Sequence, residues 1–96
     1  MKFSWDLEKE KTNRRKHHVT FSEACYVFAD RFAITIYDEA HSTEEERWVT
    51  IGEIPTLKLL VVIHTHKISG HPEYVRIISA RKAQANEARA YMTRRG

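Results

Sequence analysis

The sequence predicts an α+β fold in which a small antiparallel sheet carries two N-terminal helices and one C-terminal helix. Apolar residues recur at helical spacing before residue 32 and alternate with a period of two after it, which indicates helices followed by strands. The segment 57–66 is apolar on both strand faces, as expected of a central strand that is covered on both sides. Alanines favour a final helix, so the predicted element order is β-α-α-β-β-β-β-α.

The chain opens with a short extended segment, 3–5, which is followed by a predicted helix over 6–17. Asp6 stands where an N-cap residue would accept hydrogen bonds from the first free amides of that helix. Leu7 is its only strongly apolar residue, so much of its surface is predicted to be exposed. That surface carries hydrogen-bond donors at helical spacing, namely Lys9, Asn13 and Lys16 or His17.

A second, shorter helix is predicted to begin at Ser22, which is a good N-cap residue. Apolar side chains follow at positions i, i+3 and i+4, namely Ala24, Val27 and Phe28. Cys25 lies within this apolar stretch, and we interpret it as a small packed hydrophobic residue rather than a reactive thiol.

Four strands account for the middle of the chain. One is predicted from residue 32 onward, and three more are predicted over 47–51, 57–66 and 74–81. Gly52 is predicted to end the second of them, and the final helix is predicted over 82–92. The acidic interval 38–46 lacks apolar periodicity and is predicted to be a mobile loop.

Length and composition restrict the possible classes of protein. With 96 residues and 11.3 kDa, the chain is expected to form a single domain over 1–96. Its longest aliphatic run, 59–63, is too short to cross a bilayer, and its charged N-terminus lacks the apolar region of a signal peptide. We therefore expect a cytoplasmic protein without a membrane partner. The single cysteine excludes an intramolecular disulfide.

Charge is segregated along the chain, although the net charge is only +3. Basic side chains cluster in 9–16 and 76–95, and acidic side chains cluster between them in 38–46. If folding brings the two basic segments together, they would attract phosphate groups in a salt-dependent manner. The alternative is that both segments are solvated helix faces beside an acidic loop.

Four motifs together span most of the chain: Phe3-x-Trp5-Asp6, Lys16-His17-x-Val19-x-Phe21-x-Glu23-Ala24, Leu59-Leu60-Val61-Val62-x-His64-Thr65 and Arg76-Ile77-Ile78-Ser79-Ala80-Arg81-x-Ala83. They resemble the BrnT family of type II toxins, and the last motif is quite specific. His18 departs from the family pattern, where a small residue, often glycine, turns the chain. The resemblance implies a bacterial ribonuclease toxin that has a RelE-like α+β fold and inhibits translation.

The resemblance also implies partners. RNA would be the substrate, and a ribbon-helix-helix antitoxin of the BrnA kind would neutralise the toxin in a complex of two toxins and two antitoxins. Operator DNA would then be bound by the antitoxin rather than by this chain. The alternative assembly is a toxin homodimer that uses Trp48 or an edge strand. No cofactor is expected.

RNA cleavage without a metal ion needs a base for the 2′-hydroxyl, an acid for the leaving oxygen and cations for the phosphate. His64 is the candidate for proton transfer, because the ordinary pKa of histidine lies near 6.5. If the turn after it centres on Gly70, antiparallel pairing brings three pairs together: His64–Arg76, Val62–Ile78 and Leu60–Ala80. The alternative is a packed or edge histidine with a backbone partner.

Arg76 and Arg81 are the candidates for stabilising the phosphate charge, and Lys16 and Arg47 for positioning the RNA. The alternative for Arg81 is a structural ion pair with a partner such as Glu46. His17 is a further candidate for substrate binding, because the same helix end projects it together with Lys16. By resemblance to RelE-like toxins, in which C-terminal Arg and Tyr side chains serve the active site, Tyr91 is another. Trp5 and Trp48 either stack on bases or belong to the core.

Two other classes of function stay open. The cluster of His64, His66 and His71 is conceivable as a zinc site, but no matching cysteine or carboxylate motif accompanies it. A non-catalytic nucleic-acid binder would need only the segregated charge, although no known readout motif is present. We therefore predict a metal-independent endoribonuclease with no metal ligands.

Overall fold

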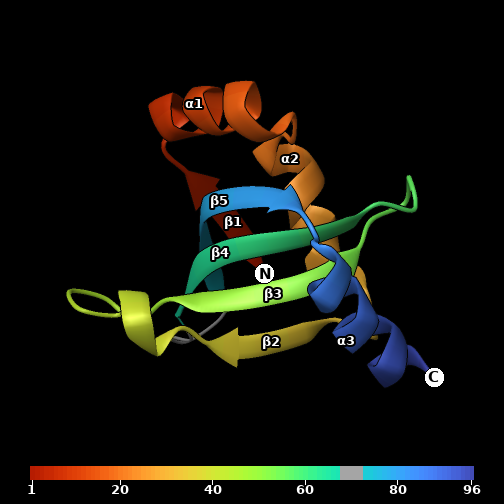
Figure 1. The fold of residues 1–96 in the computed structure, drawn as a ribbon. Coiled ribbons are helices and arrows are strands. Elements are labelled where there is room, and N and C mark those ends of the chain that lie inside the picture. The colour runs from red at the N-terminus through yellow and green to blue at the C-terminus, as the bar shows by residue number, and fades with distance from the viewer. Residues whose placement is uncertain (68–72) are drawn as a thin grey trace.

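The computed structural model describes residues 1–67 and 73–96, and its five strands form one sheet with the spatial order β1-β5-β4-β3-β2 (Figure 1). The strands are β1 (Lys2–Trp5), β2 (Ile34–Tyr37), β3 (Trp48–Glu53), β4 (Leu59–Lys67) and β5 (Tyr74–Lys82). The α-helices are α1 (Leu7–His17), α2 (Phe21–Ala24) and α3 (Ala85–Arg95), and the 3-10 helices are η1 (Cys25–Ala29) and η2 (Glu39–His41). The predicted α+β class and element order are confirmed. Gly70 and His71 lie outside the described residues.

The sheet is mixed, whereas the sequence predicted an antiparallel one. β1 runs parallel to β5 and pairs with it from Lys2–Tyr74 to Trp5–Ile77. All other neighbouring strands are antiparallel. β5 lies next to β1 in the sheet but is the last strand in the sequence. The long connection between them allows β5 to run either parallel or antiparallel to β1. Hydrophobic periodicity within a strand does not reveal which direction it takes.

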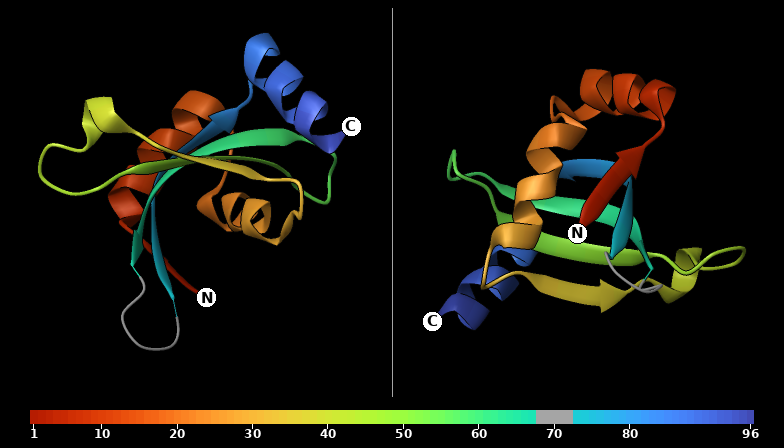
Figure 2. Two further views of the ribbon diagram at one scale, coloured as in Figure 1. Left: turned by 90° about the horizontal axis from the view of Figure 1, so that it is seen from below. Right: turned by 180° about the vertical axis from the view of Figure 1, so that it is seen from behind.

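Helices cover the two faces of the sheet unequally (Figure 2). α2 and η1 cross one face, where Phe21 and Val27 pack against Leu60 and Val62 of β4. α3 packs at one corner of the other face, where Tyr91 joins a smaller cluster. We call the first the helical face and the second the open face. β4 lies at the centre of the sheet with buried residues on both faces, which confirms the predicted central strand.

Gly52 lies inside β3 instead of ending it. A Cβ atom at this position would come within 2.9 Å of the Val27 Cβ atom and 3.1 Å of the Val27 carbonyl oxygen. Glycine is therefore required here because η1 approaches the strand closely, not because the chain turns.

α2 begins at Phe21 and has Thr20, not the predicted Ser22, as its N-cap residue. The Thr20 hydroxyl accepts a hydrogen bond from the Glu23 amide at 3.1 Å, and the Glu23 carboxylate accepts one from the Thr20 amide at 3.1 Å. This reciprocal capping box satisfies two free amides at once. Ser22 has no glutamate three residues later, and in the structure it is exposed.

The predicted register between β4 and β5 is wrong by one residue next to the turn and by two residues beyond a bulge in β5. The register shifts between Ile63 and His64, and Ile78 has no partner on β4. The observed pairs are Leu60–Lys82, Val62–Ala80 and His64–Ile77. A bulge adds one residue to one strand, so it explains the second residue of the error beyond Ile63 but not the offset nearer the turn. Arg76 lies on the turn side of the bulge and pairs with Thr65, not with His64, because the pairing from Lys67–Tyr74 onward is already offset by one residue from the predicted register.

α3 begins at Ala85, three residues later than the predicted start at 82. β5 continues to Lys82, which pairs with Leu60. A capping box between Gln84 and Glu87 then starts the helix. No helix within residues 1–67 and 73–96 is long and apolar enough to cross a membrane.

His18 ends α1 in the left-handed conformation, with φ 58° and ψ 32°, where the resemblance led us to expect a small residue. Left-handed backbone disfavours residues with a Cβ atom by about 1–2 kcal/mol, while glycine loses about 0.5–1 kcal/mol more in backbone entropy. We expect His18→Gly to raise the free energy of unfolding by about 0.5–1 kcal/mol and the melting temperature by about 4 °C. Thermal unfolding followed by circular dichroism measures this shift.

Arg15→Gly is the matched control, because Arg15 is exposed within the same helix. It should lower the free energy of unfolding by about 1 kcal/mol. Equal destabilisation by both substitutions would contradict the left-handed cap at His18.

Candidate functional site

α1 lies beside β5, and a single buried side chain fixes it there. The Asn13 amide nitrogen donates to the Ala80 carbonyl at 2.8 Å, and the Asn13 side-chain oxygen accepts from the Ala80 amide at 3.1 Å. Asn13 is thus bound to both polar backbone groups of one β5 residue, like a neighbouring strand. The predicted exposed ridge on α1 is therefore wrong at Asn13, which is only 7% exposed. Leu7, by contrast, is 70% exposed, so α1 is held by polar contacts.

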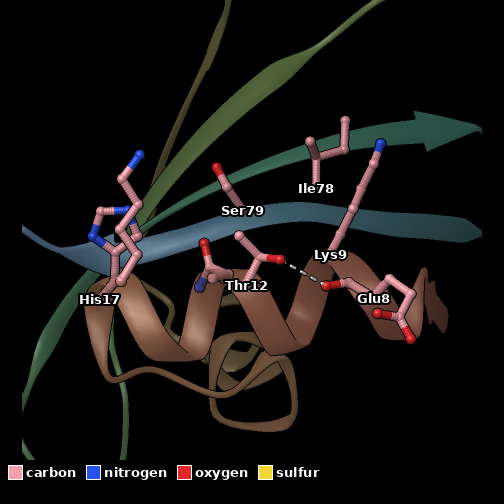
Figure 3. Close-up of a pocket in the computed structure, with 8 residues that line it drawn as sticks. Glu8, Lys9, Thr12, His17, Ile78 and Ser79 are labelled. Carbon is pink, nitrogen blue, oxygen red and sulfur yellow. Dashed lines mark hydrogen bonds between the residues drawn. The ribbon is translucent and has the colours of Figure 1, made fainter.

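A groove of about 520 Å³ lies between the exposed side of α1 and strand β5 (Figure 3). Lys9, Thr12 and His17 project from the helix, and Ile78 and Ser79 face them from the strand. The full lining also includes Glu8, Asn13 and Lys16. The groove joins two segments that lie about sixty residues apart in the sequence.

The charge of this groove follows from the sequence of α1. Acidic Glu8 and Glu10 lie in the first turn and four basic residues lie in the last turn, which suits the helix dipole. Glu8 already pairs with Lys11 at 3.5 Å. Lys9 and Lys16 form no ion pair among the described residues, so their charges face the groove and solvent.

Arg76 and Arg81, the two predicted phosphate ligands, lie on the open face of the sheet. Their partners on β4 are Thr65 and Val61, which have the same parity along the strand and so point to the same side. Each arginine has a carboxylate partner. Arg76 pairs with Glu45 of the loop before β3, and Arg81 pairs with Glu87 of α3.

The ion pair between Arg81 and Glu87 is better suited to a structural role than the ion pair between Arg76 and Glu45. The Arg81 guanidinium donates two hydrogen bonds of 2.8 Å to the two oxygens of Glu87. These bonds raise the pKa of Arg81 and lower the pKa of Glu87. The sequence suggested Glu46 as the partner, and the structure has Glu87 instead.

The Arg76 pair is more accessible. The side chains of Arg76 and Glu45 are 42% and 40% exposed, against 35% and 19% for Arg81 and Glu87. Exposed ion pairs contribute little to stability, so a phosphate can replace Glu45 at small loss. Arg76 also lines a cavity of about 280 Å³ with Ser4, Thr65 and Lys67.

His64 lies on the helical face and is fully buried. Its Nδ1 atom donates to the Thr65 carbonyl at 3.1 Å, its Nε2 atom lies 2.7 Å from the Thr50 hydroxyl, and Phe28 packs edge-on against the ring. Burial lowers the pKa of His64 to about 4. Proton transfer by His64 stays a prediction, and this placement favours the structural alternative with a backbone partner.

Comparison with known proteins agrees with the predicted resemblance. A family model described as the ribonuclease toxin BrnT of type II toxin–antitoxin systems matches residues 5–87. This chain belongs to the BrnT family. The 1.1 Å crystal structure of the Brucella abortus ribonuclease toxin BrnT is similar, with a TM-score of 0.65 and 28% sequence identity over 88% of this chain and 97% of that one. Comparison with curated proteins gives no match.

Tyr91 of this BrnT-family chain lies in the core and is not at a surface. Its side chain is 1% exposed, and its hydroxyl donates to Asp30 at 2.6 Å. Burial and this hydrogen bond raise the pKa of Tyr91 to about 12. Asp30 also accepts from the amides of Phe32 and Glu53; burial raises its pKa, but the hydrogen bonds together lower it. A contact between Tyr91 and the substrate stays a prediction, and it would require α3 to move away from the sheet.

Arg47 lies just before β3 and lines a cavity of about 210 Å³ in the acidic loop, apart from the α1 groove. Its backbone, not its guanidinium, is held: the Arg47 amide donates to Ser42 at 3.0 Å, and its carbonyl accepts from the Asp38 amide at 2.9 Å. The structure therefore brings together Lys16 and His17 and places Arg76, Arg81 and the buried Tyr91 on the open face. Arg47 lies beside the acidic loop, and His64 is buried on the helical face.

The other candidate residues have ordinary packing roles. Trp5 packs edge-on against Phe21 at the core, while Trp48 is half-buried against Tyr37. The Cys25 thiol donates to the Phe21 carbonyl at 3.2 Å, and burial raises its pKa. Within the described ranges, no three His, Cys, Asp or Glu side chains are grouped closely enough to hold a metal ion.

Sequence reasoning missed two polar partners, Glu87 of Arg81 and Asp30 of Tyr91, and it gave Asn13 an exposed role instead of the buried one in which it fixes α1. One signal was available for Asn13, because asparagine is a poor helix former and its place in mid-helix indicates a specific partner.

Proposed function

We propose that this BrnT-family chain cleaves RNA without a metal ion at the groove between α1 and β5, and that the cleavage inhibits translation in the bacterial cytoplasm. The observation that supports this most is the meeting of Lys9, Lys16 and His17 with Ser79 across one groove. Two distant segments contribute to it, with the positive charge coming from α1 and the facing wall from β5. Phosphate contacts of this kind supply most of the affinity of nonspecific nucleic-acid binding.

The RNA backbone would run from this groove onto the open face of the sheet. Lys9 and Lys16 would bind one phosphate at the groove, and Arg76 would bind another after Glu45 leaves it. Ser79 and Arg76 lie three residues apart on β5, about 10 Å along the strand, so both contacts lie within the reach of a dinucleotide. Arg81, which is held by Glu87, would add to the positive potential and keep β5 and α3 together.

Proton transfer at this site is assigned to His17. It is half-buried in the groove, whereas His64 is fully buried on the other face. A group that acts as general acid or base must come within hydrogen-bond reach of the reacting oxygen. His17 meets that requirement without any rearrangement of the core.

The antitoxin would cover the same cationic surface. The family implies an antitoxin partner, and we assign it a ribbon-helix-helix type of the BrnA kind, which binds operator DNA itself. An acidic segment of that partner fits the groove by charge. Light scattering of the co-expressed pair should give a mass of two toxins and two antitoxins, and a stable dimer of this chain alone would contradict that assembly.

Cleavage of a labelled single-stranded RNA in the presence of EDTA tests the proposed activity. We expect products with 2′,3′-cyclic phosphate ends and inhibition by added antitoxin. Activity that EDTA abolishes and zinc restores would instead support a metal-dependent site. Salt-sensitive binding without products would support a non-catalytic binder.

Arg76→Gln should weaken RNA binding at every sequence and reduce the slope of log K against log salt by about 1. Glu45→Gln is the matched partner change, and it should tighten binding because it frees Arg76 and removes a negative charge. Fluorescence anisotropy of a non-cleavable RNA at several salt concentrations measures both. Weaker binding by Glu45→Gln would contradict the displacement of Glu45 by phosphate.

A further inference from the structure

A further cavity, of about 400 Å³, opens on the helical face at the Trp48 end of β3, away from the α1 groove. It is lined by Thr35 of β2, Glu46 just before β3, Trp48 of β3 and His66 of β4. Tyr37 packs edge-on against Trp48 with 5.1 Å between ring centroids. The cavity volume lies in the range of small-ligand pockets, about 300–1,000 Å³. Two of its four side chains are aromatic rings that a flat group can stack on.

A chain of hydrogen bonds that starts at His64 in the core determines whether the Thr35 hydroxyl donates or accepts. The Thr65 carbonyl can only accept, so His64 Nδ1 carries the proton and Nε2 accepts from the Thr50 hydroxyl. Thr50 has then used its proton, so it must accept from the Thr35 hydroxyl 2.8 Å away. Thr35 therefore offers the cavity lone pairs and no proton.

Glu46 gives the cavity the same character. A carboxylate accepts hydrogen bonds and donates none. Among the residues that the structure describes, Glu46 takes part in no hydrogen bond or ion pair, and its side chain is exposed. The polar groups from Thr35 and Glu46 thus present acceptors beside an aromatic wall.

We propose that this cavity binds a guanine base of the RNA, which rests on the ribonuclease function proposed above. Guanine is the base whose pairing edge carries two adjacent donors, N1–H and the 2-amino group, which match the two oxygens of a carboxylate. Its remaining amino proton is available to the Thr35 oxygen, and its ring can stack on Trp48. Recognition of unpaired bases by aromatic stacking and edge hydrogen bonds is the usual mode for single-stranded RNA.

Other ligands match the cavity less well. Adenine and cytosine each present one amino donor beside a ring acceptor, which would face the Glu46 carboxylate unfavourably. Uracil presents a single donor between two acceptors. An arginine side chain of a protein partner has suitable donors, but its small plane would fill little of about 400 Å³.

Fluorescence titration of Trp48 tests this site directly. Trp5→Phe, a conservative change, leaves Trp48 as the single indole. Titration with guanosine, inosine and adenosine monophosphates isolates the base, because the three ligands share the same sugar and phosphate. We expect guanosine monophosphate to bind roughly tenfold more tightly than inosine monophosphate, which lacks the 2-amino donor, and more tightly still than adenosine monophosphate.

Four variants locate the contacts. Glu46→Gln and Thr35→Val should remove the preference for guanine, whereas Thr35→Ser and the exposed loop variant Glu44→Gln should retain it. Amide chemical shifts of Thr35 and Trp48 provide a second reading that does not depend on fluorescence. Equal binding of the three nucleotides, or a guanine preference that survives Glu46→Gln, would overturn the proposal. So would quenching by free arginine but not by guanosine monophosphate.

The outcome is separable from that of the proposed function. If RNA is cleaved without bias and guanosine monophosphate does not bind, this inference fails while the ribonuclease assignment stands. If guanosine monophosphate binds but the protein cleaves no RNA, the ribonuclease assignment fails while the guanine site stands. With both correct, cleavage sites mapped on a long RNA should lie at a preferred distance from a guanine, and Glu46→Gln should disperse them.

Discussion

Replacing His17 with glutamine should slow RNA cleavage by about 10²–10⁴-fold, the usual effect of removing a general acid or base. His17 is the one histidine that lines the groove between α1 and β5 within the described part of the chain. Glutamine retains a hydrogen-bonding side chain of similar length, so binding of RNA should change little while proton transfer is lost. Single-turnover cleavage at saturating protein separates these two effects.

The neighbouring histidine provides the control. His18 is exposed at the helix end and does not line the groove, and asparagine tolerates its left-handed backbone. His18→Asn should therefore cleave at close to the parental rate. If His17→Gln retained the parental rate, or if His18→Asn lost as much, proton transfer at His17 would be excluded.

His64→Ala should lower the free energy of unfolding by about 3–4 kcal/mol. Removing the fully buried ring leaves a cavity beside Phe28, and it leaves the Thr50 hydroxyl and the Thr65 carbonyl without their partner. Urea unfolding measures the change. His64→Gln, which can replace one of the hydrogen bonds, should be affected less.

Acid should weaken the fold through the same residue. The pKa of His64 falls from an ordinary 6.5 to about 4 in the folded chain, because burial disfavours the charged ring. The unfolded chain therefore binds the proton first, so this contribution to stability is complete above pH 6.5 and is lost as the pH falls from 6.5 to about 4. The expected loss is about 3 kcal/mol.

His64→Gln should show a much flatter decline over that pH range. An equally steep decline would mean that another group controls acid unfolding. Full stability combined with loss of cleavage in His64→Gln would instead support the catalytic role that the sequence suggested.

The sequence was sufficient for the element types because each element depends on a local pattern. The switch from helical spacing to alternation located the boundary before β2, and the run that is apolar on both faces identified β4 as the central strand. Asp6 was identified as an N-cap, and its carboxylate accepts from the Glu8 and Lys9 amides. Basic side chains of α1 line the groove, but β5 contributes only Ile78 and Ser79 to it, so the expected meeting of the two basic segments stays a prediction.

The errors arose where a distant contact decides the outcome. The pairing next to the turn is offset by one residue from the predicted register, so Arg76 lies opposite Thr65, and the bulge at Ile78 adds a second residue beyond His64; no local pattern marks either shift. His64 follows two buried apolar residues on its face and continues their burial, because Thr50 and the Thr65 carbonyl satisfy both ring nitrogens. Tyr91 is drawn inward by Asp30, sixty-one residues earlier in the chain. The local sequence around a residue such as His64 or Tyr91 is the same whether its side chain faces solvent or a buried partner.

The location of the RNA is the central claim, and a titration followed by NMR tests it most directly. A short RNA with 2′-O-methyl groups cannot be cleaved, because its nucleophile is blocked, and it can be added to isotope-labelled protein at low salt. We expect the largest amide shifts along α1 from Lys9 to His17 and at Ile78 and Ser79 of β5. Shifts confined to α3 or to the outer edge of β2, with α1 unchanged, would contradict the groove as the RNA site.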